Sequence, residues 1–229
     1  MKLVFLHALP FDGAMWEDTI GALGREAVAP SLFDLGDSIE EWAFGVLDAV
    51  GTEELIVVGC SVGGSCALEV AAAAPDQVAA IVLVGAKAEV NHDPVLRDEA
   101  IQMLETHGIE AAWHRYWLPL FAESTSSSVK DSARSWAMAH DVDSVVRGVR
   151  AFHDRRDLSS FAARWDRPLI GISGDRDVAP SPSKLRQLAT GPNREFHLVA
   201  ECGHYVNLEQ PAAFDALLAE AIRPIVERS

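Results

Sequence analysis

The pentapeptide Gly-Cys-Ser-Val-Gly at residues 59–63 places Ser61 where it could act as a nucleophile. Residues 55–58 before it are apolar and rich in β-branched side chains, which is typical of a strand buried on both faces. Residues 64–74 after it have the pattern of a helix that ends at Pro75. A strand, Gly-x-Ser-x-Gly and a helix form a nucleophile elbow. The free N–H groups at the helix N-terminus favour the anion that forms during acyl transfer. By itself the motif also fits a glycine-rich turn between a strand and a helix, in which the serine has no catalytic role.

Two later loops supply the groups that such a serine requires, a base and an acid that orients the base. Asp175 and Asp177 follow a predicted strand at residues 168–173, and His204 follows a predicted strand at residues 194–199. The carboxyl ends of strands in an open parallel sheet share one edge, where ligands bind. We therefore expect the imidazole and one of the two carboxyl groups to lie near the nucleophile.

With these motifs in this order, the sequence resembles the α/β-hydrolase family over nearly its whole length apart from one insertion. Members of this family share the elbow, an acid on a Gly-x-x-Asp loop and a Gly-His motif after the last strand. The chain has the second motif at residues 174–177 and the third at residues 203–204. Residues 11–16 also match the usual start of the family's first helix, and residues 208–211 match its usual ending.

The resemblance implies a role for each member of the triad. Ser61 is the nucleophile, His204 is the general base and then the general acid, and Asp177 orients the imidazole. Asp175 is the rival acid. The Gly-x-x-Asp spacing favours Asp177, which leaves Asp175 as a solvated or loop-capping residue.

The resemblance also implies an oxyanion hole built from the backbone N–H groups of Val62 and Leu9. At the second donor the chain departs from the family, which usually has His-Gly where this chain has His7-Ala8. Alanine resists backbone angles that glycine tolerates, so the position of Leu9 depends on whether the loop needs such angles. We expect His7 to be a hydrogen-bonded structural residue rather than a catalyst.

Alternating strands and helices must position these loops. The alternation predicts an α/β fold, a mostly parallel sheet of about six strands with helices on both faces. The resemblance makes this the α/β-hydrolase fold, without the antiparallel strand pair that commonly precedes its first parallel strand. Strands are predicted at residues 3–6, 27–33, 55–58, 78–84, 168–173 and 194–199, and helices at residues 14–23, 38–50, 64–74, 183–189 and 210–222.

Residues 87–165 interrupt this alternation and divide the predicted core into residues 1–86 and 166–229. The stretch has no clear buried strand and is far longer than an ordinary connection, so we predict a helical insertion. It falls where the family carries its cap. Trp113 and Trp117 lie at i and i+4 in it and either pack the insertion onto the body or bind substrate. If they bind substrate, they cover an apolar pocket over Ser61, and the exclusion of water from this pocket strengthens the oxyanion contacts.

Composition excludes several classes of function. The chain has 229 residues and a net charge of −15, which argues against nucleic acids and anionic membranes as partners. No apolar run approaches the length of a signal peptide or membrane span. Cys60, Cys66 and Cys202 form no disulfide framework, which indicates a reducing cytoplasm, and we expect the first two to fill the core. The histidines lack ligand spacing, so we expect no metal and no cofactor.

These patterns predict a cytoplasmic serine hydrolase that cleaves a carboxylic ester or lactone of a small, largely apolar molecule through an acyl-enzyme. Within the family the chain most resembles the small-esterase and 3-oxoadipate enol-lactonase branch. Haloalkane dehalogenases have Asp at the position of Ser61 and are disfavoured. Two alternatives remain open, a carbon–carbon bond hydrolase that uses the same triad and a ligand-sensing receptor with little turnover. The natural substrate and the oligomeric state are also left open, a homodimer being one option.

Overall fold

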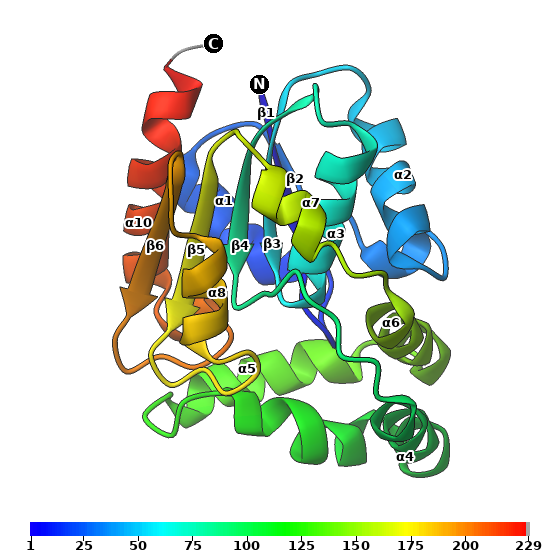
Figure 1. Cartoon of the computed structure of the whole chain (residues 1–229). Helices are drawn as coiled ribbons and strands as arrows, with labels where there is room; N and C mark the ends of the chain where they lie inside the picture. Colours follow the sequence, from blue (N-terminus) through cyan, green and yellow to red (C-terminus); the bar gives the residue numbers. More distant parts are fainter. Residues whose placement is uncertain (228–229) are drawn as a thin grey trace.

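A six-stranded sheet lies at the centre of the structure, a computed structural model that describes residues 1–227. Its order is β2-β1-β3-β4-β5-β6, and every pair of neighbouring strands is parallel (Figure 1). All side chains of β3 and β5 are buried, as expected when helices cover both faces of a parallel sheet. The predicted fold class is confirmed. The strands are β1 (Lys2–Leu6), β2 (Ala27–Val28), β3 (Leu55–Cys60), β4 (Val78–Val84), β5 (Leu169–Gly174) and β6 (Arg194–Val199).

Helices cover both faces of this sheet. In Figure 1, α3 and α8 lie in front of the strands, while α1 and α10 lie behind them. α2 packs against α3, and its first residue follows Ser38, whose hydroxyl accepts the Glu41 N–H at 3.2 Å. Ser38 therefore caps this helix as predicted. The helices are α1 (Glu17–Leu23), α2 (Ile39–Val50), α3 (Val62–Ala73), α8 (Pro182–Leu188), α9 (Val206–Glu209) and α10 (Pro211–Val226).

The predicted strand at residues 27–33 is wrong beyond its first two residues. β2 ends at Val28, and Leu32–Asp34 forms a 3₁₀ turn instead. Pro30 has no N–H to donate to a sheet, and the Leu32 N–H donates to the His7 imidazole rather than to a strand. Leu32 and Phe33 are thus buried as part of a turn rather than of a strand.

The chain between β4 and β5 forms helices that lie across the carboxyl ends of the strands. In Figure 1, α4, α5 and α6 lie at the foot of the sheet, below the arrowheads, whereas α7 lies in front of the strands near α3. α4 is interrupted at Gly108, which has a φ of 78°. The helices are α4 (Pro94–Ala112), a π-helical turn (Trp113–Trp117), a 3₁₀ turn (Leu118–Leu120), α5 (Ser127–Met138), α6 (Val142–Asp154) and α7 (Ser159–Arg164).

The three cysteines are free thiols inside the protein. Burial raises the pKa of each thiol, so none is a ready thiolate. Cys60 and Cys66 therefore fill the core, as predicted. Across residues 1–227, none of the helices combines the length and the apolar character that a membrane crossing requires.

Candidate active site

Ser61 lies at the turn between β3 and α3 in a rarely populated backbone conformation, with φ 54° and ψ −117°. The turn requires glycine on both sides. A Cβ at Gly59 would lie 2.2 Å from the carbonyl oxygen of Gly63, and one at Gly63 would lie 2.2 Å from that of Leu6. The Ser61 N–H donates to the carbonyl of Val84 in β4 at 2.9 Å. The predicted strand–turn–helix is therefore present, and it brings the serine to the wall of a cavity.

His204 and Asp177 contact each other in the interior. Nδ1 of His204 lies 3.0 Å from Oδ2 and 3.1 Å from Oδ1 of Asp177, and the two residues are 1% and 4% exposed. Oδ1 of Asp177 also accepts the Ala179 N–H at 2.9 Å. An ionised carboxylate only accepts hydrogen bonds, so Nδ1 carries the proton and Nε2 remains a base.

Asp175, the rival acid, has a different partner. Its Oδ1 accepts the Cys202 N–H at 3.1 Å, and its Oδ2 lies 3.7 Å from Nε of Arg176. Asp175 therefore ties its own loop to the loop that carries His204, without contacting the imidazole. This is the loop-capping role that the Gly-x-x-Asp spacing indicated.

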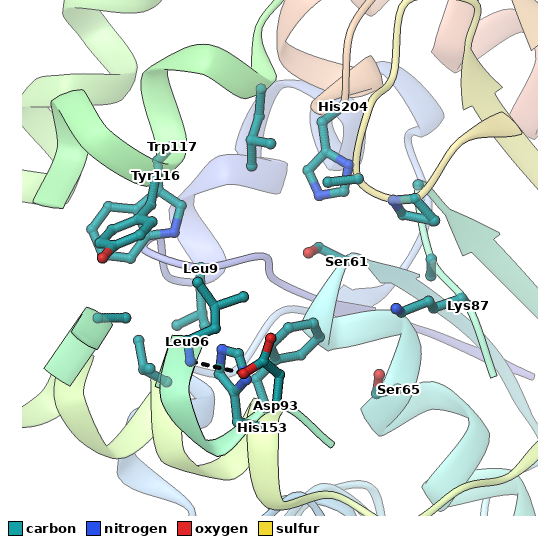
Figure 2. A pocket seen from close by; sticks show the side chains of 18 of the residues that line it. Leu9, Ser61, Ser65, Lys87, Asp93, Leu96, Tyr116, Trp117, His153 and His204 are labelled. Carbon is teal, nitrogen blue, oxygen red and sulfur yellow. Dashed lines mark hydrogen bonds between the residues drawn. The ribbon is translucent and has the colours of Figure 1, made fainter. Parts of the chain in front are cut away.

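Ser61 and His204 line the same cavity, which has a volume of about 550 Å³. Figure 2 shows the Ser61 hydroxyl and the His204 ring facing this space, with Leu9, Tyr116 and Trp117 on the opposite side. Most of the remaining wall comes from the helical segment between β4 and β5. The cavity is thus closed by two parts of the chain that are far apart in sequence.

Only one of the two predicted tryptophans lines this cavity. Trp117 does, but Trp113 is 1% exposed and packs inside the protein. The ring centroid of Trp113 lies 5.9 Å from that of Phe121 and 6.3 Å from that of Phe11. The expectation that Trp113 binds substrate is therefore wrong, because this side chain packs the insertion onto the body.

Gly85, directly after β4, is a site residue that the sequence analysis missed. Its φ is +52°, and an added Cβ would lie 2.9 Å from Nδ1 of His204 and 3.1 Å from Oδ2 of Asp177. A glycine at the carboxyl end of a buried strand was the available signal. Its absent side chain leaves room for the imidazole–carboxylate contact.

Glu209 holds the histidine loop in place. Its Oε2 accepts the N–H of Gly203 at 3.0 Å and that of Ala122 at 2.8 Å, and its Oε1 accepts the Tyr205 N–H at 3.0 Å. Thr125 donates its hydroxyl to the same carboxylate at 2.5 Å. One side chain thus ties both neighbours of the histidine to the helical insertion. The sequence motif at residues 208–211 contained Glu209 without indicating this role.

The two expected oxyanion donors lie on different elements. Val62 is the first residue of α3, where N–H groups have no acceptor within the helix. Leu9 lines the cavity, and its carbonyl accepts the Tyr205 hydroxyl at 3.1 Å. In residues 1–227 the non-glycine residues with positive φ do not include Ala8. The alanine therefore takes an ordinary backbone conformation, and this loop does not need the family's glycine.

His7 is a buried structural residue, as predicted. Its Nε2 accepts the Leu32 N–H at 2.8 Å, which leaves Nδ1 to donate to the Ala8 carbonyl at 3.2 Å. Burial lowers the pKa of His7 to about 4. The neutral ring thus joins the first strand to the turn at Leu32–Asp34.

Together these groups can support acyl transfer, since the Ser61 hydroxyl and the His204 imidazole line one cavity and a carboxylate orients the imidazole. In the described part of the chain, residues 1–227, no group of three His, Cys, Asp or Glu residues could hold a metal ion.

Comparisons with known proteins agree with this architecture. Residues 3–217 match the model of the alpha/beta hydrolase family. Esterase Rv0045c of Mycobacterium tuberculosis is 28% identical over 99% of this chain and 83% of its own length. A thermophilic esterase from Thermogutta terrifontis has a TM-score of 0.91 at 20% identity, over 98% of this chain and 90% of that one. The enol-lactonase from Burkholderia xenovorans LB400 has a TM-score of 0.85 at 20% identity, over 97% of this chain and 91% of that one. The chain belongs to the alpha/beta hydrolase family.

Proposed function

We propose that this protein is a serine hydrolase that cleaves a carboxylic ester or a lactone through an acyl-enzyme intermediate. The observation that carries the proposal is the buried contact between His204 and Asp177, beside a cavity that Ser61 also lines. A hydrolase needs an imidazole of one defined tautomer next to its nucleophile, and this contact supplies it. The similarity to an esterase supports the ester, and the similarity of fold to an enol-lactonase supports the lactone.

In this mechanism the Ser61 hydroxyl attacks the substrate carbonyl while Nε2 of His204 takes its proton. The N–H groups of Val62 and Leu9 donate to the oxyanion of the tetrahedral intermediate. His204 then returns the proton to the leaving alkoxide, and Ser61 is left acylated. The alcohol of an ester departs, whereas the new hydroxyl of a lactone stays attached to the acyl chain. Water, deprotonated by His204, attacks the acyl group, and the acid leaves as the serine is regenerated. Asp177 stabilises the imidazolium at both stages.

The helical insertion acts as the cap of this site. A cavity of about 550 Å³ suits a small molecule, and large apolar side chains from the insertion line it. These walls exclude water from the reacting carbonyl, which strengthens the oxyanion hydrogen bonds. The residues that contribute are Leu96, Leu104, Trp117, Val149 and Phe152.

The test is turnover of 4-nitrophenyl butyrate by the wild-type protein and by Ser61→Ala. We expect steady turnover by the wild type and a fall in kcat of about 10⁶ in the variant. Ser132→Ala is the matched control, since this serine lies on the exposed side of α5. A serine-directed sulfonyl fluoride should also add one adduct, located on Ser61 by mass spectrometry.

Three other outcomes would change the proposal. Full ester turnover by Ser61→Ala would rule out this nucleophile. Cleavage of a β-diketone without cleavage of esters would indicate a carbon–carbon bond hydrolase. Saturable ligand binding without turnover of any compound would indicate a receptor.

A further inference from the structure

Two cationic side chains, Lys87 and Arg155, line the same cavity as Ser61. Figure 2 shows the Lys87 side chain directed into this space, on the side of Ser61. Arg155 is 6% exposed, although the chain as a whole has a net charge of −15. Buried cations are ordinarily paired with carboxylates, because an unpaired charge loses its hydration without compensation.

Neither cation has such a partner in residues 1–227. In the part of the chain that the structure describes, no carboxylate oxygen lies within ion-pair distance of Lys87 or Arg155, whereas Arg156 pairs with Glu69. Arg155 donates from Nη1 to the carbonyl of Phe152, and its guanidinium carbon lies 3.9 Å from the centroid of that ring. None of its other N–H groups is both buried and without a hydrogen-bond partner, so these groups reach open space. Arg155 lines this cavity and, with Lys87, also a smaller pocket beside Glu69, whose carboxylate is already paired with Arg156.

The charge of Arg155 acts on Lys87. Burial lowers the pKa of Lys87, and the charge of Arg155 lowers it further. Burial lowers the pKa of Arg155 to about 10, although the charge of Asp157 opposes this shift, so Arg155 remains protonated at neutral pH. An anion in the cavity would compensate both groups at once.

Asp157 acts through space on Arg155 and Glu89 acts on Lys87, but both carboxylates also have direct partners of their own. Asp157 accepts the N–H groups of Val90 at 3.0 Å and of Ser159 at 2.8 Å. Glu89 lies 2.8 Å from Nζ of Lys184. Asp93, which also lines the cavity, accepts the N–H of Leu96 at 3.0 Å and caps α4. The positive end of the cavity is therefore left for a ligand.

We propose that Lys87 and Arg155 bind a carboxylate group of the substrate, so that the preferred esters or lactones carry a negative charge at a distance from the scissile carbonyl. This inference rests on the proposed function and replaces the sequence-based expectation of a largely apolar substrate. A guanidinium matches a carboxylate with two parallel N–H donors, and a lysine adds a point charge. Both interactions are stronger in a cavity that excludes water than on the surface.

The test compares two esters of similar length, mono-4-nitrophenyl glutarate, which has a terminal carboxylate, and the neutral 4-nitrophenyl hexanoate. We expect the wild-type kcat/KM to be at least about tenfold higher for the glutarate ester. Lys87→Met and Arg155→Met should each lower this preference, mainly through KM, and the double variant should abolish it. Lys130→Met is the control, because it removes one positive charge from α5, away from the residues that line the cavity.

Glutarate binding to Ser61→Ala, measured by calorimetry, gives a readout that does not depend on turnover. Weaker binding when Arg155→Met is added would support the subsite even if neither ester is cleaved, an outcome that would overturn only the proposed function. Hydrolysis of both esters at equal efficiency, unchanged in Lys87→Met, would overturn the subsite and leave the hydrolase intact. Lys87→Met also keeps the test informative if Arg155→Met does not fold, since Lys87 is only partly buried.

Discussion

Both carboxylate oxygens of Asp177 lie within 3.1 Å of a single nitrogen, Nδ1 of His204. One of these oxygens is also fixed by the N–H of Ala179 at 2.9 Å. The carboxylate therefore cannot turn away from the imidazole without losing a backbone hydrogen bond. This arrangement determines which ring nitrogen carries the proton, and four predictions follow from it and from its surroundings.

Asp177→Asn should lower kcat by about 10⁴ with little change in fold. The Asn oxygen would remain on the Ala179 N–H, which places the amide NH₂ against Nδ1 of His204. Nδ1 must then accept, so the ring proton moves to Nε2 and the base is lost. The measurement is the pH profile of kcat/KM on 4-nitrophenyl butyrate.

Asp175→Asn is the matched control, because an Asn oxygen can still accept the Cys202 N–H that Asp175 accepts at 3.1 Å. We expect its kcat to stay near that of the wild type. If Asp175→Asn instead proved the more damaging of the two, the assignment of Asp177 as the orienting acid would be wrong.

Gly85→Ala should lower kcat strongly while the protein remains folded. The backbone cost of alanine at positive φ is about 1–2 kcal/mol, but the new Cβ would lie 2.9 Å from Nδ1 of His204 and displace the ring. Gly24→Ala is the control, since its φ is +57° and an added Cβ meets nothing within 4 Å. Urea denaturation should show the backbone cost in both variants and a further cost at Gly85, where the added Cβ would also lie 3.0 Å from the His204 carbonyl oxygen, and kcat should fall only at Gly85. Equal activities would show that the methyl group is accommodated.

Trp117→Ala and Trp113→Ala should have different effects on specificity. Trp117 lines the cavity, so its truncation should raise the relative kcat/KM for longer 4-nitrophenyl esters. Trp113 packs on Phe11 and Phe121, so its truncation should cost about 3–5 kcal/mol of unfolding free energy and leave the order of substrates unchanged. An altered chain-length preference in Trp113→Ala would contradict this assignment.

His7 should make the protein less stable as the pH falls from 6.5 towards 4. The pKa of the folded state is lowered to about 4, so between these values the unfolded chain binds the proton and the folded chain does not. Above pH 6.5 the titration of His7 does not reduce the free energy of unfolding. As the pH falls to the folded-state pKa, this titration lowers the free energy of unfolding by about 3 kcal/mol.

His7→Gln removes this titration while keeping an acceptor for the Leu32 N–H. Unfolding free energies at pH 7 and pH 4.5, from urea titrations, should differ less in the variant than in the wild type. The same pH dependence in both proteins would show that the imidazole does not titrate in this range.

Local patterns predicted most of the architecture. β4 begins and ends at the predicted residues, 78–84, because its apolar, β-branched run is buried between two neighbouring strands. β6 also has its predicted bounds, 194–199, although it is an edge strand that is only partly buried. The elbow was equally readable, because the strand, the Gly-x-Ser-x-Gly motif and the helix follow one another directly in the sequence. The segment at residues 27–33 was not predictable in this way, because the Leu32 N–H donates to His7, which is 25 residues away in sequence.

The sequence by itself determined the order of the elements, the elbow at Ser61 and the two loops that could hold an acid and a base. Only the tertiary structure decided that Asp177 contacts His204, that Trp113 packs inside while Trp117 lines the cavity, and that Lys87 and Arg155 line the same cavity as Ser61. Strand and turn propensities act over a few residues, so a single sequence displays them. Side-chain partners are set by how distant segments pack. Trp113 and Trp117 also lie in a π-helical turn, where residues four apart need not share a face as they do in an α-helix.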